Sequence, residues 1–370
     1  MSSRLLVGTR KGVFSITRDS HGKWSVAGVS FLGVPCSLTL HDPRDGASYA
    51  ALGHGHFGVK LHRSRDQGKT WQEIAAPKYP PKPEGLVELD PNFKKEIPWS
   101  TELVWELATG GKDQPGTLWC GTIPGGLFRS DDHGGSWQIM TSLWRHPDRP
   151  KWAGGGAELP GIHSVAVDPR DSKRVAVAVS CGGIWQTKDS GETWQIRAKG
   201  MRAEFMPKGM EYTELAQDPH RMVRCAAAPD TLWVQHHNGI FVTDDDCANW
   251  REITGVKPSV FGFGVVVHPR DPKTAWFVPA QKDEVRVPVE ARVVVTRTRD
   301  GGKSFDMLTK GLPQHNAYDL VYRHALDLDA NGDRLAFGST TGSLWISENQ
   351  GDSWQRLDAS LPPIYCVRFA

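Results

Sequence analysis

The chain has 370 residues, 44 of them basic and 42 acidic, so its formal net charge is +2. This balance argues against a nucleic-acid binder, which needs a basic stripe, and no apolar stretch approaches the roughly 20 residues of a membrane span. The 39 glycines, 25 prolines and 15 tryptophans are typical of strands joined by many turns.

The beginning of the chain, Met1 to Val7, runs directly into strand-like sequence and lacks the apolar core and cleavage site of a secretory signal. Six cysteines stand singly, with no Cys-x-x-Cys pair. Scattered thiols of this kind suit a reducing compartment. We therefore expect a cytoplasmic protein.

An octet of the form Ser/Thr-x-Asp-x-Gly-x-Ser/Thr-aromatic recurs along the chain. Four copies are intact, and three are degraded, with Cys247 replacing the glycine in one and Asn349 the aspartate in another. The final aromatic residues stand 47 to 66 residues apart, at Trp24, Trp71, Trp137, Trp194, Trp250, Phe305 and Trp354. This spacing is the period of a four-stranded unit, and it indicates a repeat architecture.

The octet predicts its own local structure. Its hydroxyl and carboxylate groups cap backbone N–H groups of a tight hairpin turn, its glycine takes a positive φ, and its aromatic residue packs between sheets. Five further tryptophans lie on second or third strands, so eleven of the fifteen are expected in the core.

The strands within one unit are readable in the fourth repeat, at residues 163–168, 174–179 and 183–187, with Trp194 opening the fourth strand. Comparable first strands are expected to start near Cys36, Glu102, Arg224, Phe263 and His324. The N-terminus supplies only three strands, at 5–8, 12–16 and 24–27, and residues 364–369 fit as the missing innermost strand. The sequence therefore predicts one domain over 1–370, a seven-bladed β-propeller whose first blade is shared between residues 1–30 and 361–370. A count of six blades would require discarding the N-terminal unit.

The octet resembles the Asp-box (BNR) repeat of the sialidase superfamily, and the resemblance covers the whole chain. In the resembling families the boxes are structural and lie on the face opposite the active site. The chain departs from true sialidases, because its string Thr122-Ile123-Pro124 lacks the arginine of their Arg-Ile-Pro element. It looks more like the cytoplasmic bacterial proteins labelled sialidase-like by their repeats. Related Asp-box propellers include xyloglucan hydrolases, polysaccharide lyases and non-catalytic assembly factors, so the fold does not choose the chemistry.

The face opposite the boxes carries the turns between second and third strands and the long connections between repeats, and any site is expected there. Nine of the 14 histidines fall on this face: His54, His56, His146, His163, His220, His236, His237, His315 and His324. Arg224 is expected beside His163 and His324, opening an inner strand at the channel mouth.

Three interpretations of these histidines stay open. In the first they are catalytic acids or bases: the candidates are His163, His236, His237 and His324, with Glu211 or Glu284 as a carboxylate partner and Tyr212 or Tyr318 as an alternative base. The candidate substrate-binding residues are Arg10, His54, His56, Arg224, Lys282, Arg286, Trp152 and His220, with Arg224 and Arg286 pairing an anion. In the second, His54, His163 and His236 hold a divalent metal (Zn, or Mn or Ca), although their spacing does not match a helical zinc site. In the third, loop histidines only hydrogen-bond turn backbones.

The function expected from these residues is an enzyme, a hydrolase or lyase acting on a small anionic carbohydrate or similar polar metabolite. The alternatives are a non-catalytic propeller scaffold that binds a protein and a metal-dependent hydrolase of the lactonase type. No cofactor is expected beyond the divalent metal of the second interpretation, and no oligomeric state is predicted.

Overall fold

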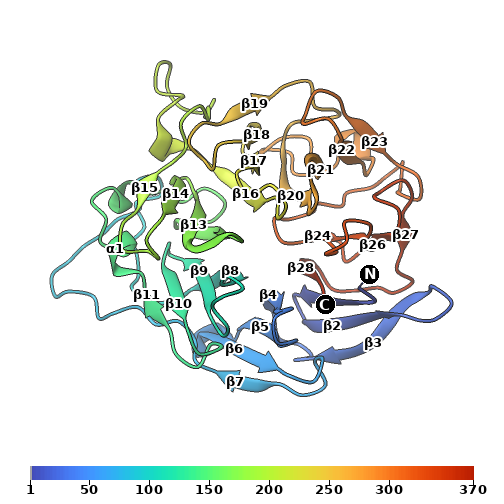
Figure 1. The fold of residues 1–370 in the computed structure, drawn as a ribbon, viewed down its shortest axis with the longest axis horizontal. Helices are drawn as coiled ribbons and strands as arrows, with labels where there is room; N and C mark the ends of the chain where they lie inside the picture. The colour runs from blue at the N-terminus through green and yellow to red at the C-terminus, as the bar shows by residue number, and fades with distance from the viewer. Residues whose placement is uncertain (1) are drawn as a thin grey trace.

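The computed structural model describes residues 2–370 and consists of seven four-stranded antiparallel sheets arranged around a central channel (Figure 1). This confirms the predicted seven-bladed β-propeller. The first blade combines β1 (Arg4–Thr9), β2 (Gly12–Arg18) and β3 (Trp24–Ser30) with the C-terminal strand β28 (Ile364–Phe369).

The other six blades follow in chain order. The second blade contains β4 (Cys36–His41), β5 (Ser48–Gly53), β6 (Val59–Ser64) and β7 (Gln72–Ile74). The third contains β8 (Leu103–Thr109), β9 (Leu118–Ile123), β10 (Leu127–Ser130) and β11 (Gln138–Ile139). The fourth contains β12 (Gly161–Asp168), β13 (Asp171–Ser180), β14 (Gly183–Thr187) and β15 (Gln195–Ile196). The fifth blade contains β16 (Pro219–Arg224), β17 (Leu232–His236), β18 (Gly239–Thr243) and β19 (Arg251–Ile253). The sixth contains β20 (Gly262–His268), β21 (Asp271–Pro279), β22 (Val295–Thr298) and β23 (Asp306–Leu308). The seventh contains β24 (Leu326–Leu328), β25 (Leu335–Gly338), β26 (Leu344–Ser347) and β27 (Gln355–Arg356).

Helix is confined to the connections. The elements are α1 (Thr141–Trp144) and the 3-10 turns η1 (Gly55–Phe57), η2 (Arg149–Lys151), η3 (Glu214–Ala216) and η4 (Val289–Ala291). Within residues 2–370, no helix has the length and apolar character needed to cross a membrane.

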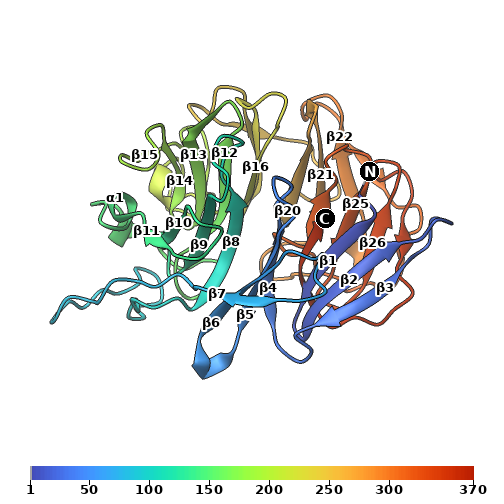
Figure 2. The ribbon, with the colours of Figure 1, turned by 60° about the horizontal axis from the view of Figure 1, so that its bottom comes forward.

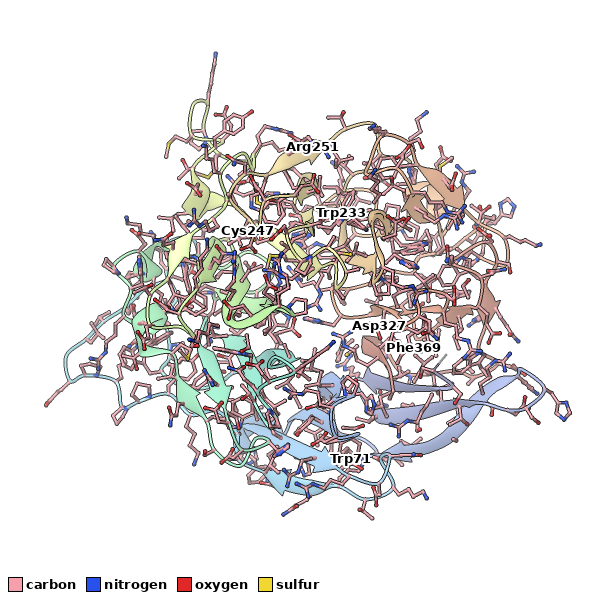
Figure 3. All side chains as sticks on the ribbon, viewed as in Figure 1. Trp71, Trp233, Cys247, Arg251, Asp327 and Phe369 are labelled. Atoms are coloured by element: carbon pink, nitrogen blue, oxygen red, sulfur yellow. The ribbon has the colours of Figure 1, made fainter. Side chains whose placement is uncertain are left out.

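The ring closes where β28 pairs with β1, as predicted. The two strands run antiparallel, with Val7 opposite Val367 and Leu6 opposite Arg368. The same strand also contacts the seventh blade, because Val367 N–H donates to the His324 carbonyl at 2.9 Å. Figure 3 shows Asp327 beside Phe369, whose N–H donates to the Asp327 carboxylate at 2.8 Å. The chain end is therefore held by blades on both sides.

The box turns have the predicted hydrogen bonds. In the second blade, Ser64 Oγ accepts from Gly68 N–H at 2.7 Å, and Asp66 accepts from the N–H and hydroxyl of Thr70 at 2.9 and 2.6 Å. Gly68 has a φ of +84°. In the seventh blade Asn349 replaces the aspartate and keeps the geometry, since its Oδ1 accepts from Ser353 N–H at 2.9 Å.

The core forms between blades, where tryptophans of the second and third strands are fully buried. These residues are Trp119, Trp185, Trp233, Trp276 and Trp345. Four of the box tryptophans, at 24, 194, 250 and 354, are also buried. Trp71 and Trp137 are half-buried, so most of the tryptophan content is explained by the blade-to-blade core.

The placement of Arg224 differs from the sequence prediction. Arg224 ends β16 rather than opening it, and its Nη1 lies 2.8 Å from the carboxylate of Asp246 in the box turn. Residues 225–230 lack the Asp-Pro-Arg-Asp string that follows β4 and β12, so this strand was misaligned in the sequence: His220, not Arg224, occupies the position of His163. Arg224 therefore lies on the box face and cannot contribute to an anion clamp at the channel mouth.

The box carboxylates generate a prediction about acid stability. Hydrogen bonds from neighbouring hydroxyl and N–H groups lower the pKa of Asp66, Asp189 and Asp300 to about 2. A carboxyl whose native pKa lies below its unfolded value of about 3.9 stabilises the fold fully above that value and loses the effect as the pH falls toward 2. Exchanging all three for asparagine should therefore flatten the fall in unfolding free energy between about pH 4 and pH 2.

The measurement is urea denaturation as a function of pH. Asn349 shows that the turn accepts asparagine, and the control is Glu192→Gln, an exposed side chain of the same kind of turn. An unchanged slope in the triple variant would contradict the prediction.

Candidate functional site

A cavity of about 380 Å³ lies at the channel mouth, on the face opposite the box turns. Its lining comes from five blades and from the connection that leads into the fourth: Pro35, Ser37, Gly53, Leu103, Trp105, Ile123, Gly156, Ala157, Arg286, Tyr322, Arg323, His324 and Tyr365. No aspartate or glutamate is in this lining. The pocket is therefore aromatic and cationic.

Bulges near the start of the inner strands direct side chains toward the channel. In β4, β8, β12 and β16 the register shifts at Ser37, Trp105, His163 and His220 respectively. A bulge leaves one residue unpaired and changes the direction of its side chain, which is why bulges are frequent at functional sites. Ser37 and Trp105 line the pocket itself.

Arg221 connects opposite sides of the channel below the pocket. Its guanidinium pairs with the buried Glu106 and donates from Nη1 to the His163 carbonyl at 2.9 Å. Nη1 also lies 3.1 Å from His324 Nδ1, and Arg368 Nη2 lies 3.3 Å from the same atom. Burial raises the pKa of Glu106, against the opposing effect of Arg221.

His324 is held in one tautomer by these arginines. Guanidinium groups only donate, so His324 Nδ1 must accept and Nε2 carries the proton. Burial lowers the pKa of His324 well below its usual range, so the ring is neutral. Nε2 is buried and has no partner in the protein. His324 therefore offers a neutral donor in the pocket wall.

Arg323 is a second unpaired donor. It is 5% exposed, and its guanidinium lies 4.8 Å from the Trp105 ring centre and 5.2 Å from that of Phe263. Its Nε and Nη2 atoms have no hydrogen-bond partner in the protein. Burial lowers its pKa to about 10, so the charge persists at neutral pH. A Cβ at Gly156 would lie 2.5 Å from Nη2, so only a glycine lets the backbone pack this closely against the guanidinium.

Asp218 is the centre of a cluster beside the pocket. Its Oδ1 accepts from Ser180 Oγ and from Cys181 N–H, both at 3.2 Å. Its Oδ2 lies 3.6 Å from His220 Nε2 and 3.4 Å from His237 Nδ1.

The three ionisable groups of this cluster shift one another's pKa values. The pKa of Asp218 is well below its usual range, because the nearby histidines and Arg323 outweigh burial. Burial lowers the pKa of His220. The pKa of His237 is raised, because the Asp218 carboxylate outweighs its burial.

Some predicted residues come together on this face. His324 and Arg286 line the pocket, and His220 and His237 flank Asp218. His163 is buried behind Trp105, its ring centre 5.5 Å from that of the indole, and its Nε2 has no partner in the protein. Burial lowers the pKa of His163 well below its usual range.

Other predicted residues lie away from the pocket or serve the backbone. Trp152 is buried against Trp185, with ring centres 5.6 Å apart, which contradicts its expected role in substrate binding. His236 Nε2 accepts from Asp218 N–H at 3.0 Å, as the third interpretation expects. The remaining candidates are outside the lining: Arg10, His54, His56, Glu211, Tyr212, Lys282, Glu284 and Tyr318.

The expected metal set of His54, His163 and His236 is not assembled. In the described chain, two groups have donor atoms within 4.8 Å of one another: Asp218, His220 and His237; and Asp168, Asp230 and Asp246. The second group lies on the box face and pairs with Arg170, Arg174 and Arg224. It is therefore a salt-bridge network.

Arg323, Trp105 and Glu106 were not among the site residues predicted from the sequence, and Asp218 had no predicted role. Arg323 directly precedes His324, and the register of the inner strands was the signal that could have revealed it. The long connection from β7 to β8 contacts the connection that leads into the fourth blade. It extends beyond its own blade (Figure 2), and Asp90 in it accepts a hydrogen bond from Gly154 N–H at 2.5 Å.

Comparisons with known proteins find relatives among xyloglucanases. The oligoxyloglucan-reducing end-specific xyloglucanase of Emericella nidulans is 26% identical over 274 residues, which cover 66% of this chain and 31% of that protein. A probable enzyme of the same kind from Neosartorya fischeri is 25% identical over 279 residues, covering 67% of the chain and 31% of that protein. The chain thus spans under a third of the length of these curated relatives. No protein-family model matches the sequence.

Solved structures share the fold. The GH74 xyloglucanase from Xanthomonas campestris has a TM-score of 0.64 at 17% identity, covering 96% of this chain and 52% of that one. YCF48 from Cyanidioschyzon merolae has a TM-score of 0.54 at 13% identity, covering 89% of this chain and 87% of that one. At these identities the likeness shows the propeller fold alone, and the resemblance to sialidases rests on the box motif.

The buried pair of Glu106 and Arg221 generates a prediction about stability. Removing one partner of a buried ion pair leaves an uncompensated charge, so Arg221→Met should lower the free energy of unfolding by about 3 kcal/mol. The double variant Glu106→Gln/Arg221→Met removes both charges and should recover most of that loss. Urea denaturation of both variants at pH 7 checks this, and a double variant at least as unstable as the single one would contradict it.

Proposed function

We propose that the channel-mouth pocket binds a carbohydrate and that the chain cleaves a glycosidic bond of this ligand. The single observation that carries the proposal is the set of buried donors without partners at the pocket, Arg323 and His324, with His163 behind them. Buried polar groups are normally paired, so unpaired ones at a cavity point to a ligand that supplies acceptors. The names of the relatives, which describe enzymes acting on xyloglucan oligosaccharides, support a carbohydrate.

The side chains of the pocket lining support a carbohydrate ligand. Trp105, Tyr322 and Tyr365 supply aromatic surface of the kind on which sugar rings pack, and Ser37 adds a hydroxyl. Hydroxyl and ring oxygens of a sugar can accept from His324 Nε2.

Arg323 supports an acidic group on the carbohydrate. A desolvated guanidinium with free N–H groups pairs best with a carboxylate or sulfate, through charge-assisted hydrogen bonds. Arg286 is a second cation in the lining. The proposed ligand is therefore an oligosaccharide that carries a carboxylate or sulfate.

Hydrolysis is the route that the names of the relatives favour. Elimination is a second candidate, favoured by the absence of carboxylates from the pocket lining, because most glycoside hydrolases place two carboxylates about the scissile bond. In an elimination, Tyr322 or Tyr365 as a phenolate would take the proton from the carbon next to the sugar carboxylate, and Arg323 and His324 would stabilise the negative charge that develops there. The C–O bond to the leaving sugar would then break as the C=C double bond forms, and the tyrosine would return the proton to the leaving oxygen. We propose a cytoplasmic location as well, since all six cysteines are free and five of them are buried.

The prediction concerns acidic and neutral oligosaccharides. Arg323→Met should weaken binding of acidic oligosaccharides by about 10- to 100-fold, the range of a charged hydrogen bond. It should leave the affinity for neutral xyloglucan oligosaccharides within about threefold. Because an unpaired buried charge is removed, the variant should also be more stable than the wild type. Calorimetric titration and thermal unfolding measure these effects.

The control is Arg299→Met, an exposed arginine of a box turn on the opposite face. Products analysed by mass separate the two routes, because hydrolysis adds one water and elimination leaves an unsaturated sugar. Binding of neither class of oligosaccharide would overturn the carbohydrate proposal and favour a non-catalytic scaffold.

A further inference from the structure

The cluster around Asp218 is not explained by the pocket. Asp218 precedes β16, His220 occupies the bulge of that strand, and His237 lies in the turn between β17 and β18. One donor atom from each residue, Asp218 Oδ2, His220 Nε2 and His237 Nδ1, lies within 4.8 Å of the other two. Asp218 and His220 are buried, and the His237 side chain is 24% exposed. The group is therefore reachable from one side.

The distances within the cluster are too long for strong hydrogen bonds. Oδ2 of Asp218 stands 3.6 Å from His220 and 3.4 Å from His237, whereas an N–H···O bond has a heavy-atom distance of about 2.9 Å. Two ligands of a tetrahedral ion at about 2.0–2.1 Å are separated by about 3.3–3.4 Å. The two distances from Asp218 Oδ2 are thus close to those between ligands of one ion, and the two histidine nitrogens lie within 4.8 Å of each other.

The tautomer of His220 agrees with this spacing. His220 Nδ1 lies 2.7 Å from the Gly262 carbonyl, which can only accept, so Nδ1 carries a proton. In the neutral ring Nε2 then directs a lone pair at the Asp218 carboxylate, a repulsive contact unless a cation lies between them. Histidines that bind metals usually donate their other N–H to a backbone carbonyl or carboxylate in this way.

The surroundings fix the donors in place. Ser180 and Cys181 hold the far oxygen of Asp218, and Phe263 stacks on the His220 ring at 4.6 Å with an interplanar angle of 13°. Outer contacts of this kind orient metal ligands. Arg323 is the cation whose charge acts on both Asp218 and His220, and it opposes a metal there.

We propose that Asp218, His220 and His237 bind one divalent transition-metal ion. Two imidazole nitrogens and one carboxylate oxygen are a donor set that Zn²⁺ accepts, with a fourth position left open. These residues differ from the His54, His163 and His236 set expected from the sequence. The inference does not depend on the carbohydrate proposal.

The experiment measures zinc binding to the full chain purified without an affinity tag and stripped with a chelator. We expect one equivalent of Zn²⁺ by calorimetric titration and a rise in melting temperature with zinc concentration, because a ligand of the folded state stabilises it. Asp218→Asn and His237→Gln should each weaken zinc binding by at least about 10-fold. His237→Gln alters a partly exposed side chain, so it keeps the test available if Asp218→Asn does not fold.

The matched control is Asp230→Asn, in the acidic group on the box face whose carboxylates already pair with arginines. This variant should bind zinc as the wild type does. Arg323→Met should bind zinc more tightly, since the opposing charge is removed. Failure of the folded wild type to bind one equivalent, or equal affinity in wild type and His237→Gln, would overturn the proposal and leave the cluster as a charged hydrogen-bonded triad.

Discussion

The pairing of β28 with β1 is the interaction on which the remaining structure depends. A propeller blade needs four strands, and the N-terminus supplies only three, so the ring closes only when the last strand of the chain completes the first blade. Closure also places residues from the chain end at the channel. Tyr365 reaches the pocket, and Arg368 reaches His324, from the strand that joins the ring.

A closed ring brings charged groups into a buried channel, where they must be paired. Glu106 from the third blade pairs with Arg221 from the fifth. Arg221 and Arg368 both contact the His324 ring of the seventh blade. Burying a charge without a partner is strongly unfavourable. The network that satisfies these charges also determines which nitrogen of His324 carries the proton, so channel stability and pocket chemistry share the same residues.

The two faces of the ring differ in how regular their turns and connections are. On the box face, short turns repeat with the same hydrogen bonds, and the acidic groups find arginines nearby. On the opposite face, the connections differ from blade to blade, and donors such as Arg323 lack protein partners. The solved structures share the propeller, but a shared fold does not choose the ligand, which these connections and bulges determine.

The sequence by itself determined the number of blades, the closure of the ring, the box turns and most of the tryptophan core. The box turns and the blades are local, because each box is a hairpin of eight residues and each blade a meander of neighbouring strands. The closure joins the two chain ends, and it was predictable because three strands at the N-terminus and one unpaired strand at the C-terminus add up to one blade. Only the tertiary structure decided which side chains meet at the channel mouth. Asp218 meets His237 within the fifth blade, and Arg323 lies between Trp105 and Phe263. Arg224 lies on the face opposite the one predicted for it. The physical reason is that the positions of Asp218, His237 and Arg224 depend on the bulge that shifts the register of β16, and that Arg323 meets side chains from two other blades. The repeat pattern encodes neither the bulge nor the contact between blades.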